Sequence, residues 1–199
     1  MRQRLVQDVS ALPTYAFGPR MTTWWGTLGF IVLEGTGFAL AAGAYLYLAV
    51  LNQQWPLSVA PPELIWSGVF TIVMLVSIWP NYLAKQSGRQ EDLPRSRRNL
   101  VIMSLIGLVL LGIRWFEFST LNVAWDANAY GSLIWLLLGL HTTHLLTDVG
   151  DTLVLTALMF TGHARGKRFS DVEDNAVYWD FVVLVWLPIY ALIYWYPRL

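Results

Sequence analysis

The chain has 199 residues, of which 56% are hydrophobic and only 13% are charged, well below the ~25% of ordinary soluble domains. Its formal net charge is zero, which excludes a general electrostatic attraction to nucleic acid, and it has no cysteine, which excludes disulfides, thiolate metal sites and iron–sulfur clusters. The composition therefore favours a membrane protein.

Hydrophobic runs predict the fold. A helix needs roughly 20 apolar residues to cross about 30 Å of hydrocarbon. We expect an all-α, polytopic membrane helical bundle with five transmembrane helices, forming one domain over residues 23–199. Residues 1–22 lack the apolar stretch of a signal peptide before Pro13 and are expected to form a cytoplasmic N-terminal arm. The five predicted spans are residues 23–51, 63–84, 99–123, 129–161 and 177–196.

Basic residues gather on one side of the five-span arrangement. Five lie in residues 85–98 and three in residues 162–175. The N-terminal arm adds Arg2, Arg4 and Arg20, whereas the two intervening connections carry no basic residue. The positive-inside rule therefore predicts a cytoplasmic N-terminus and a C-terminus on the opposite side.

Glu34 is the one acid in the first predicted span. Gly29, Gly35, Gly37 and Gly43 around it predict a close approach by another helix. Two interpretations stay open. Glu34 is either a protonatable carboxyl beside a proton path or lipid cleft, or a neutral, hydrogen-bonded glutamate at a helix seam.

Arg114 and Glu117 lie three residues apart in the third predicted span, in "GIRWFEF". This spacing places both side chains on one helix face, where they can pair. We expect a structural ion pair, because a pair buried in low dielectric fixes orientation more readily than it adds stability.

Two histidines and two aspartates share one face of the fourth predicted span, in "GLHTTHLLTDVGDT". His141, His144, Asp148 and Asp151 fall within ~80° of arc at 100° per residue. The alternatives are a metal or haem site, a proton relay and a satisfied polar seam. Histidines on one helix turn cannot face each other across a haem, so the pattern favours the seam over ligation. The expected polar-seam residues are Asp148, Asp151, Arg114 and Glu117.

Three stretches, in order, resemble the cytochrome c oxidase subunit III family. "WWGTLGFIVLEGTGF" (24–38) is similar to the family's W-G-x-x-x-F-I-x-x-E segment, which carries a buried glutamate. "AYGSLIWLLLGLHTTHLL" (129–146) is similar to its Y-G-S…G-x-H-G-x-H-V stretch. "AVYWDFVVLVWLPIYALIYW" (176–195) is similar to its C-terminal helix and is the most specific match. The resemblance spans residues 23–196 and points to the short, five-helix bacterial form.

The resemblance implies roles for individual residues. Glu34 takes the place of the family's buried glutamate, and His141 and His144 take those of its paired histidines. These three are therefore the candidate proton or lipid-cleft residues, and we expect them to make polar contacts between the first and fourth spans. The residues that match the terminal motif are Tyr178, Trp179, Phe181 and Trp186.

The chain also departs from the family pattern. Asp180 stands where a histidine is usual, and Val183 where an aspartate is usual. Asp148 and Asp151 are additions of this chain. Each of them needs a partner inside the subunit or across an interface, or must be held neutral, and both possibilities remain open.

The implied function is that of an accessory, non-redox subunit of a respiratory haem–copper terminal oxidase, using cytochrome c or quinol. This chain would hold no catalytic residue, metal or cofactor of its own, although phospholipid would bind in its cleft. Haem and copper would lie in partner subunits, with subunit I as the main contact and subunit II in the same complex. The location would be the bacterial inner membrane, with the C-terminus periplasmic.

Two other functions fit the residues. A self-standing proton-coupled transporter would explain the acids and bases inside the membrane, although no inverted repeat of spans is visible. A metal- or haem-binding membrane oxidoreductase would use the histidine and aspartate row directly.

Overall fold

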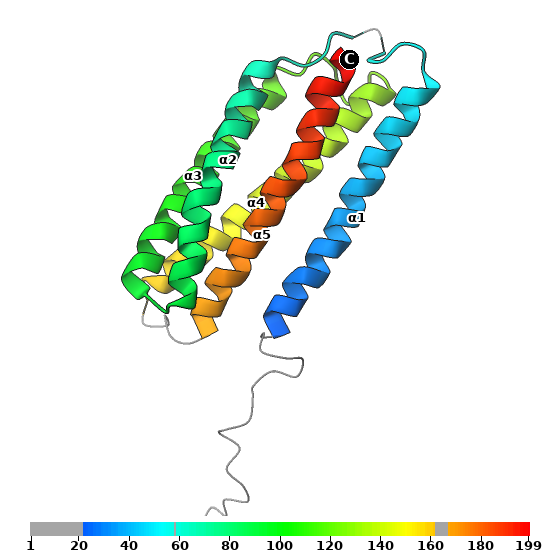
Figure 1. The fold of residues 1–199 in the computed structure, drawn as a ribbon. Coiled ribbons are helices and arrows are strands. Elements are labelled where there is room, and N and C mark those ends of the chain that lie inside the picture. Colours follow the sequence, from blue (N-terminus) through cyan, green and yellow to red (C-terminus); the bar gives the residue numbers. More distant parts are fainter. Residues whose placement is uncertain (1–21, 58, 162–166) are drawn as a thin grey trace, which may run out of the picture.

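The computed structural model describes residues 22–57, 59–161 and 167–199, and these residues form five long helices (Figure 1). The all-α prediction is confirmed, and no strand occurs in the described ranges. The predicted arm at residues 1–22 lies outside them, except for Thr22, which begins the first helix. The helices are α1 (Thr22–Leu51), α2 (Leu64–Arg89), α3 (Leu93–Ser119), α4 (Ala129–Met159) and α5 (Lys167–Tyr190).

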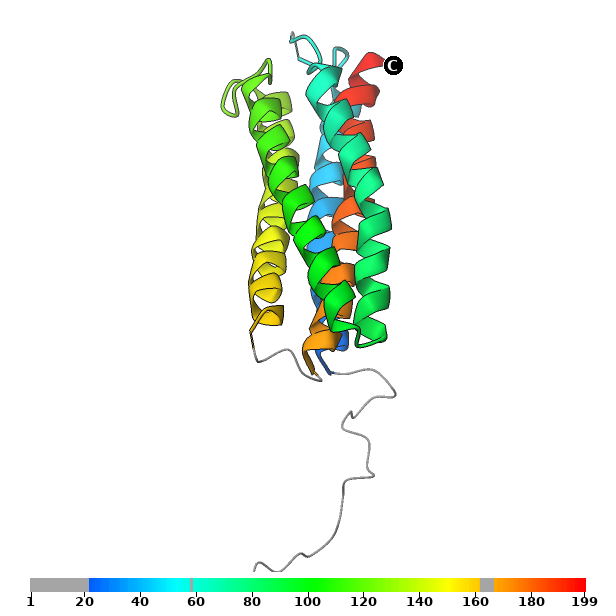
Figure 2. The ribbon, with the colours of Figure 1, turned by 90° about the vertical axis from the view of Figure 1, so that its left-hand side faces the viewer.

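The five helices lie side by side along one common direction (Figures 1 and 2). α5 packs against α1, α2 and α4, while α3 packs against α2 and α4. α1 lies at one edge of the bundle and makes its main contacts with α4 and α5. It buries only Phe38, Ala41, Tyr45 and Ala49, so most of its surface is left to the surroundings.

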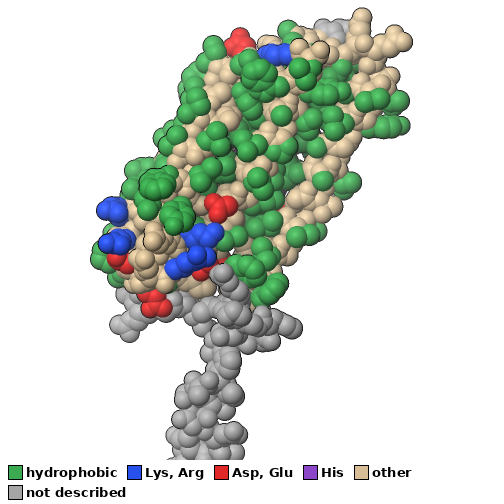
Figure 3. All heavy atoms as spheres, viewed as in Figure 1, with side chains coloured by type: hydrophobic (Ala, Val, Ile, Leu, Met, Phe, Trp, Pro, Cys, Tyr) green, Lys and Arg blue, Asp and Glu red, His purple; other side chains and the backbone are tan. Residues whose placement is uncertain are grey.

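Every helix is long and apolar enough to cross a bilayer. Large hydrophobic side chains such as Leu40, Val50 and Trp115 are exposed, which suits lipid rather than water. Figure 3 shows hydrophobic side chains along the length of the helices and most charged side chains near the end where α1 begins. The chain is therefore a multi-pass membrane protein.

The helix ends differ from the predicted spans. α2 continues to Arg89 and α3 begins at Leu93, so the connection between them is only three residues long, not fourteen. α5 begins at Lys167, ten residues before the predicted start. Hydropathy predicts where a helix is in hydrocarbon, whereas backbone hydrogen bonding continues into the polar layer. Asp92 sets the start of α3, since its Oδ1 accepts a hydrogen bond from Arg95 N at 3.1 Å.

Glycines mark a close helix contact, but on α3 rather than on α1. A Cβ at Gly107 would lie 2.5 Å from Val149 Cγ2, so α3 and α4 touch there. On α1, Gly35 would meet only Phe181, at 3.7 Å, and Gly37 would meet no described atom within 4 Å. Gly29 and Gly43 are equally open. The predicted close approach to α1 is thus wrong for the helices of this chain, because α1 packs at the edge of the bundle.

Two tryptophans fix α5 to α2. Trp179 Nε1 donates to Ser77 Oγ at 2.8 Å, and Trp186 Nε1 donates to Thr71 Oγ1 at 2.8 Å. Both indoles are almost fully buried. Beyond Tyr190 the helix widens into a π-helical turn, Ala191–Trp195, which follows Pro188 by three residues.

Candidate functional site

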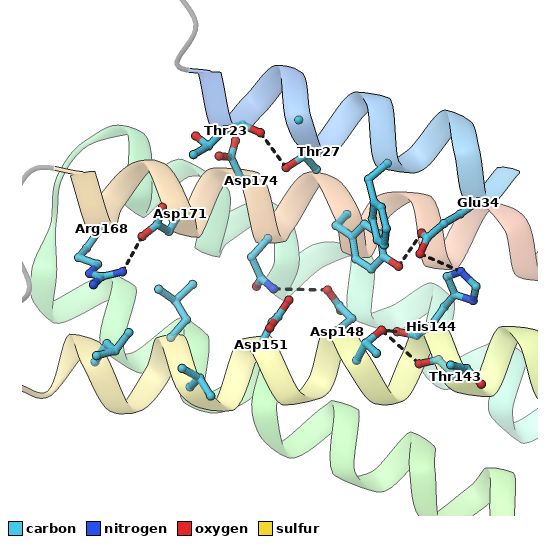
Figure 4. Close-up of a pocket in the computed structure, with 18 residues that line it drawn as sticks. Thr23, Thr27, Glu34, Thr143, His144, Asp148, Asp151, Arg168, Asp171 and Asp174 are labelled. Carbon is cyan, nitrogen blue, oxygen red and sulfur yellow. Dashed lines mark hydrogen bonds and ion pairs between the residues drawn. The ribbon is translucent and has the colours of Figure 1, made fainter. Parts of the chain in front are cut away.

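A cavity of about 880 Å³ lies between α1, α4 and α5, toward the end of the bundle where α1 begins (Figure 4). Its apolar lining includes Phe30, Val154 and Leu158. Its ionisable lining comes from all three helices, and an ionisable group at membrane depth needs a partner or a function. The ionisable residues that line the cavity are Glu34, His144, Asp148, Asp151, Arg168, Asp171, Asp174 and Tyr178.

Glu34, His144 and Tyr178 form a hydrogen-bonded group, here called the cavity cluster. His144 Nε2 lies 3.1 Å from Glu34 Oε1, and Tyr178 Oη donates to Glu34 Oε2 at 2.7 Å. Figure 4 shows Glu34 reaching from α1 toward His144 on α4. The three side chains join α1, α4 and α5 at one point.

The hydrogen bonds of His144 define where its protons are. Its Nδ1 lies 2.6 Å from the carbonyl oxygen of Leu140, which can only accept, so Nδ1 carries a hydrogen. The contact between Nε2 and Glu34 is then one of two hydrogen bonds. Either Nε2 accepts from a protonated carboxyl, or an Nε2–H donates to a carboxylate. In both arrangements one proton lies between Glu34 and His144.

Arg114, Glu117, His141 and Tyr194 form a second group, here called the sealed cluster. Arg114 Nη1 donates to Glu117 Oε2 at 2.6 Å, and Tyr194 Oη donates to Glu117 Oε1. The Arg114 guanidinium lies 3.8 Å from the Phe70 ring centroid and 4.4 Å from that of the Trp186 indole. All four members are buried to 1% exposure or less. The cluster ties α3, α4 and α5 together without contact with the cavity.

His141 belongs to the sealed cluster. Arg114 Nη2 donates to His141 Nδ1 at 2.9 Å, so this nitrogen is an acceptor. His141 Nε2 donates to the Val182 carbonyl at 3.1 Å. The imidazole is therefore neutral, with its hydrogen on Nε2. The structure separates His141 from Glu34 and His144, because Phe38 packs its ring against both imidazoles, at 4.9 Å from His144 and 6.4 Å from His141.

Asp148 and Asp151 lie in the cavity, away from Arg114 and Glu117, so the structure divides the expected seam into two places. Asp148 is buried and Asp151 is exposed. Asn175 Nδ2 donates to Asp148 Oδ1 at 3.3 Å. No sequence pattern singled out Asn175, although its position three residues before Tyr178 places the two on one face of α5.

The terminal-motif residues have different environments. Tyr178 reaches Glu34, whereas Trp179 and Trp186 bond to α2, as described above. Phe181 is partly buried against Phe38, at 6.4 Å between ring centroids. The residues of this motif thus hold α5 against α1 and α2.

Asp180 finds its partners on α2. Asn81 Nδ2 donates to Asp180 Oδ1 at 2.7 Å, and Lys85 Nζ lies 3.3 Å from Asp180 Oδ2. Val183, by contrast, is buried in the core. The acid at 180 is therefore satisfied inside this subunit.

The described residues contain no group of three or more histidine, cysteine, aspartate or glutamate side chains arranged to hold a metal ion. The ring nitrogens of His141 bond to Arg114 and to the Val182 carbonyl. Those of His144 bond to the Leu140 carbonyl and to Glu34. The arrangement suits proton holding and helix packing.

Comparison with known proteins gives the family. A sequence model of cytochrome c oxidase subunit III matches residues 48–198. The chain is 25% identical to cytochrome c oxidase subunit 3 of Thermostichus vulcanus, over 85% of each chain. It is 27% identical to that of Synechocystis, over 85% of this chain and 73% of the relative. It is 25% identical to that of Drosophila melanogaster, over 96% of this chain and 77% of the relative. The chain therefore belongs to the cytochrome c oxidase subunit III family.

Proposed function

We propose that this subunit supports assembly, lipid binding and proton uptake in a respiratory haem–copper oxidase, without carrying out redox chemistry itself. The observation that carries the proposal is the Glu34–His144 pair. It holds one proton at the wall of a cavity between three membrane helices. A proton held between an acid and a base of this kind can be passed on at little energetic cost, because each partner can accept it.

The same cavity suits lipid. Phe30, Val154 and Leu158 give it apolar walls for acyl chains. Arg168, which lies at the start of α5 and pairs with Asp171 at 3.1 Å, offers a cation near the polar layer for a phosphate group. We propose that a phospholipid occupies this space.

The partners follow from the family. Haem and copper would lie in the catalytic subunits, with subunit I as the main contact and subunit II in the same complex. The positively charged connections support a cytoplasmic N-terminus and a periplasmic C-terminus in a bacterial inner membrane. In that orientation the cavity faces the cytoplasmic half, from which protons for oxygen reduction would be drawn.

Oxygen consumption by the purified oxidase complex tests the proposal. Glu34→Ala and His144→Ala remove either side of the proton-holding pair. We expect slower oxygen consumption, inactivation after fewer turnovers and less retained phospholipid. Leu33→Ala is the matched control, because Leu33 adjoins Glu34 on α1 and is 70% exposed. Wild-type values of activity, inactivation and lipid content in both variants would contradict the proposal.

A further inference from the structure

Asp148 is a buried carboxyl at the wall of the cavity. Its side chain is 1% exposed, and it lies one helical turn from His144 on the same face of α4. Figure 4 shows it between His144 and Asp151, directed toward α5. It takes no part in the Glu34–His144–Tyr178 group.

The hydrogen bonds of Asp148 are incomplete. Oδ1 accepts from Asn175 Nδ2, and Asn175 Oδ1 accepts from Thr152 Oγ1 at 3.2 Å. The NH2 group of Asn175 thus faces Asp148, and its carbonyl oxygen faces Thr152. Oδ2 is buried and has no hydrogen-bond partner among the residues that the structure describes. One oxygen is therefore an acceptor, and the other is unused.

The basic side chains described at the cavity wall are engaged elsewhere. His144 is paired with Glu34, and Arg168 with Asp171. Within the described part of the chain, no cation pairs with Asp148. The titratable groups around it are Glu34 on α1, His144 and Asp151 on α4, and Arg168, Asp171, Asp174 and Tyr178 on α5. Most of these are acids, which add to the cost of a negative charge at Asp148.

We propose that Asp148 is a protonated carboxyl and forms a second proton-binding site in the cavity. A buried carboxylate without a cation is strongly disfavoured in low dielectric, and the group takes up a proton instead. The hydrogen bond from Asn175 fits Oδ1 as the carbonyl oxygen of the neutral acid, which leaves Oδ2 to carry the hydrogen. Asp151, three residues along α4 and exposed, offers a route for exchange with water.

This site deepens the proposed function. Four residues of helix separate Asp148 from His144, a rise of about 6 Å along α4. The cavity would then hold protons at two levels, with Asp148 nearer to the end where α1 begins. The use of this proton in oxidase turnover rests on the proposed function, whereas its presence on Asp148 does not.

Infrared spectroscopy of the intact oxidase complex tests the inference. We expect a protonated-carboxyl C=O band that shifts when aspartate carries carboxyl ¹³C, which separates it from Glu34. This band should be missing in Asp148→Asn and present in Asp151→Asn, the matched control on the same helix face. No difference between Asp148→Asn and wild type in this band would overturn the inference.

Assembly gives a second readout. Asparagine is a neutral mimic of the protonated acid, so Asp148→Asn should keep the subunit content and melting temperature of the complex. Loss of folding, or release of the subunit, would show that Asp148 is a carboxylate paired with a partner's cation, and would overturn the inference. Wild-type activity, inactivation and lipid content in both Glu34→Ala and His144→Ala would contradict the proposed function and leave the Asp148 band in place.

Discussion

The sealed cluster and the cavity cluster contain the same kinds of groups, an acid, a histidine and a tyrosine, but use them differently. His141 and His144 are three residues apart on α4, yet they bond to a backbone carbonyl through opposite ring nitrogens, Nε2 in His141 and Nδ1 in His144. His141 is neutral, with Nδ1 accepting from Arg114 and Nε2 donating to a backbone carbonyl. His144 uses Nδ1 on the backbone and leaves Nε2 for Glu34.

The two clusters differ in whether an arginine compensates the acid and in whether the cavity reaches the side chains. Arg114 compensates Glu117 and holds His141 in one tautomer, and none of these groups meets the cavity. No arginine in the described ranges pairs with Glu34, which shares a proton with His144 at a cavity wall. The sealed cluster, with its fixed charge and full burial, is a structural contact. The cavity cluster, with a shared proton beside the cavity, is a site that can exchange protons. Residue type alone does not distinguish them.

The largest effect is expected on breaking the sealed cluster at Arg114. Arg114→Met leaves the Glu117 carboxylate buried without a cation, which costs about 3–5 kcal/mol of unfolding free energy. The measurement is the thermal unfolding of the purified complex in detergent, with the amount of assembled subunit as a second readout.

The double variant Arg114→Met with Glu117→Gln separates the ion pair from the packing around it. It should recover part of the loss, since no uncompensated charge remains. A double variant less stable than the Arg114→Met single variant would show that the ion pair is not the source of the effect.

An intermediate effect is expected on truncating the two histidines. His141→Ala removes a fully buried ring and leaves Arg114 short of an acceptor, which should cost about 3 kcal/mol. His144→Ala loses a ring that borders the cavity and should cost about 1 kcal/mol. Unfolding of the two variants in the same detergent gives the comparison, and equal losses would remove the distinction between the clusters.

An effect smaller than that of Arg114→Met is also expected where α3 meets α4. Gly107→Ala places a methyl group against Val149, whose β-branched side chain has little freedom to move, and should cost about 1–3 kcal/mol. Gly112→Ala on the same helix and Gly37→Ala on α1 are controls, because neither Cβ would meet a described atom within 4 Å. A loss in either control as large as that in Gly107→Ala would mean that helix contact inside this chain is not the cause.

The sequence predicts the bundle well and the clusters only in part. Hydropathy identifies all five helices, since membrane length and apolar composition are properties of each segment alone. The Arg114–Glu117 pair is equally local, because three residues of helix bring the two side chains together. The helix ends at Arg89 and Lys167 were missed, because hydrogen bonding continues beyond the apolar run.

The separation of His141 from His144 could not be predicted from α4 alone. Their 60° difference in direction decides which neighbouring helix each one meets, and this depends on how α1, α3 and α5 are arranged around α4. Asn175 and Tyr194 were missed for the same reason. Their partners are Asp148 and Glu117, 27 and 77 residues away in the chain.

The π-helical turn at Ala191–Trp195 sets the direction in which the side chains that follow α5 point. The rings of Trp186, Tyr190 and Tyr194 follow one another in a row, with centroids 5.9 Å and 5.4 Å apart and tilted by 37° and 35°. Eight residues of regular α-helix would carry Tyr194 about 80° around the axis from Trp186. The wider turn rotates less per residue and brings the phenol back over Glu117, on the side where Trp186 covers Arg114. The π-helical turn therefore allows Trp186 and Tyr194, eight residues apart, to contact the sealed cluster from the same side. Trp186 covers Arg114, and Tyr194 donates to Glu117.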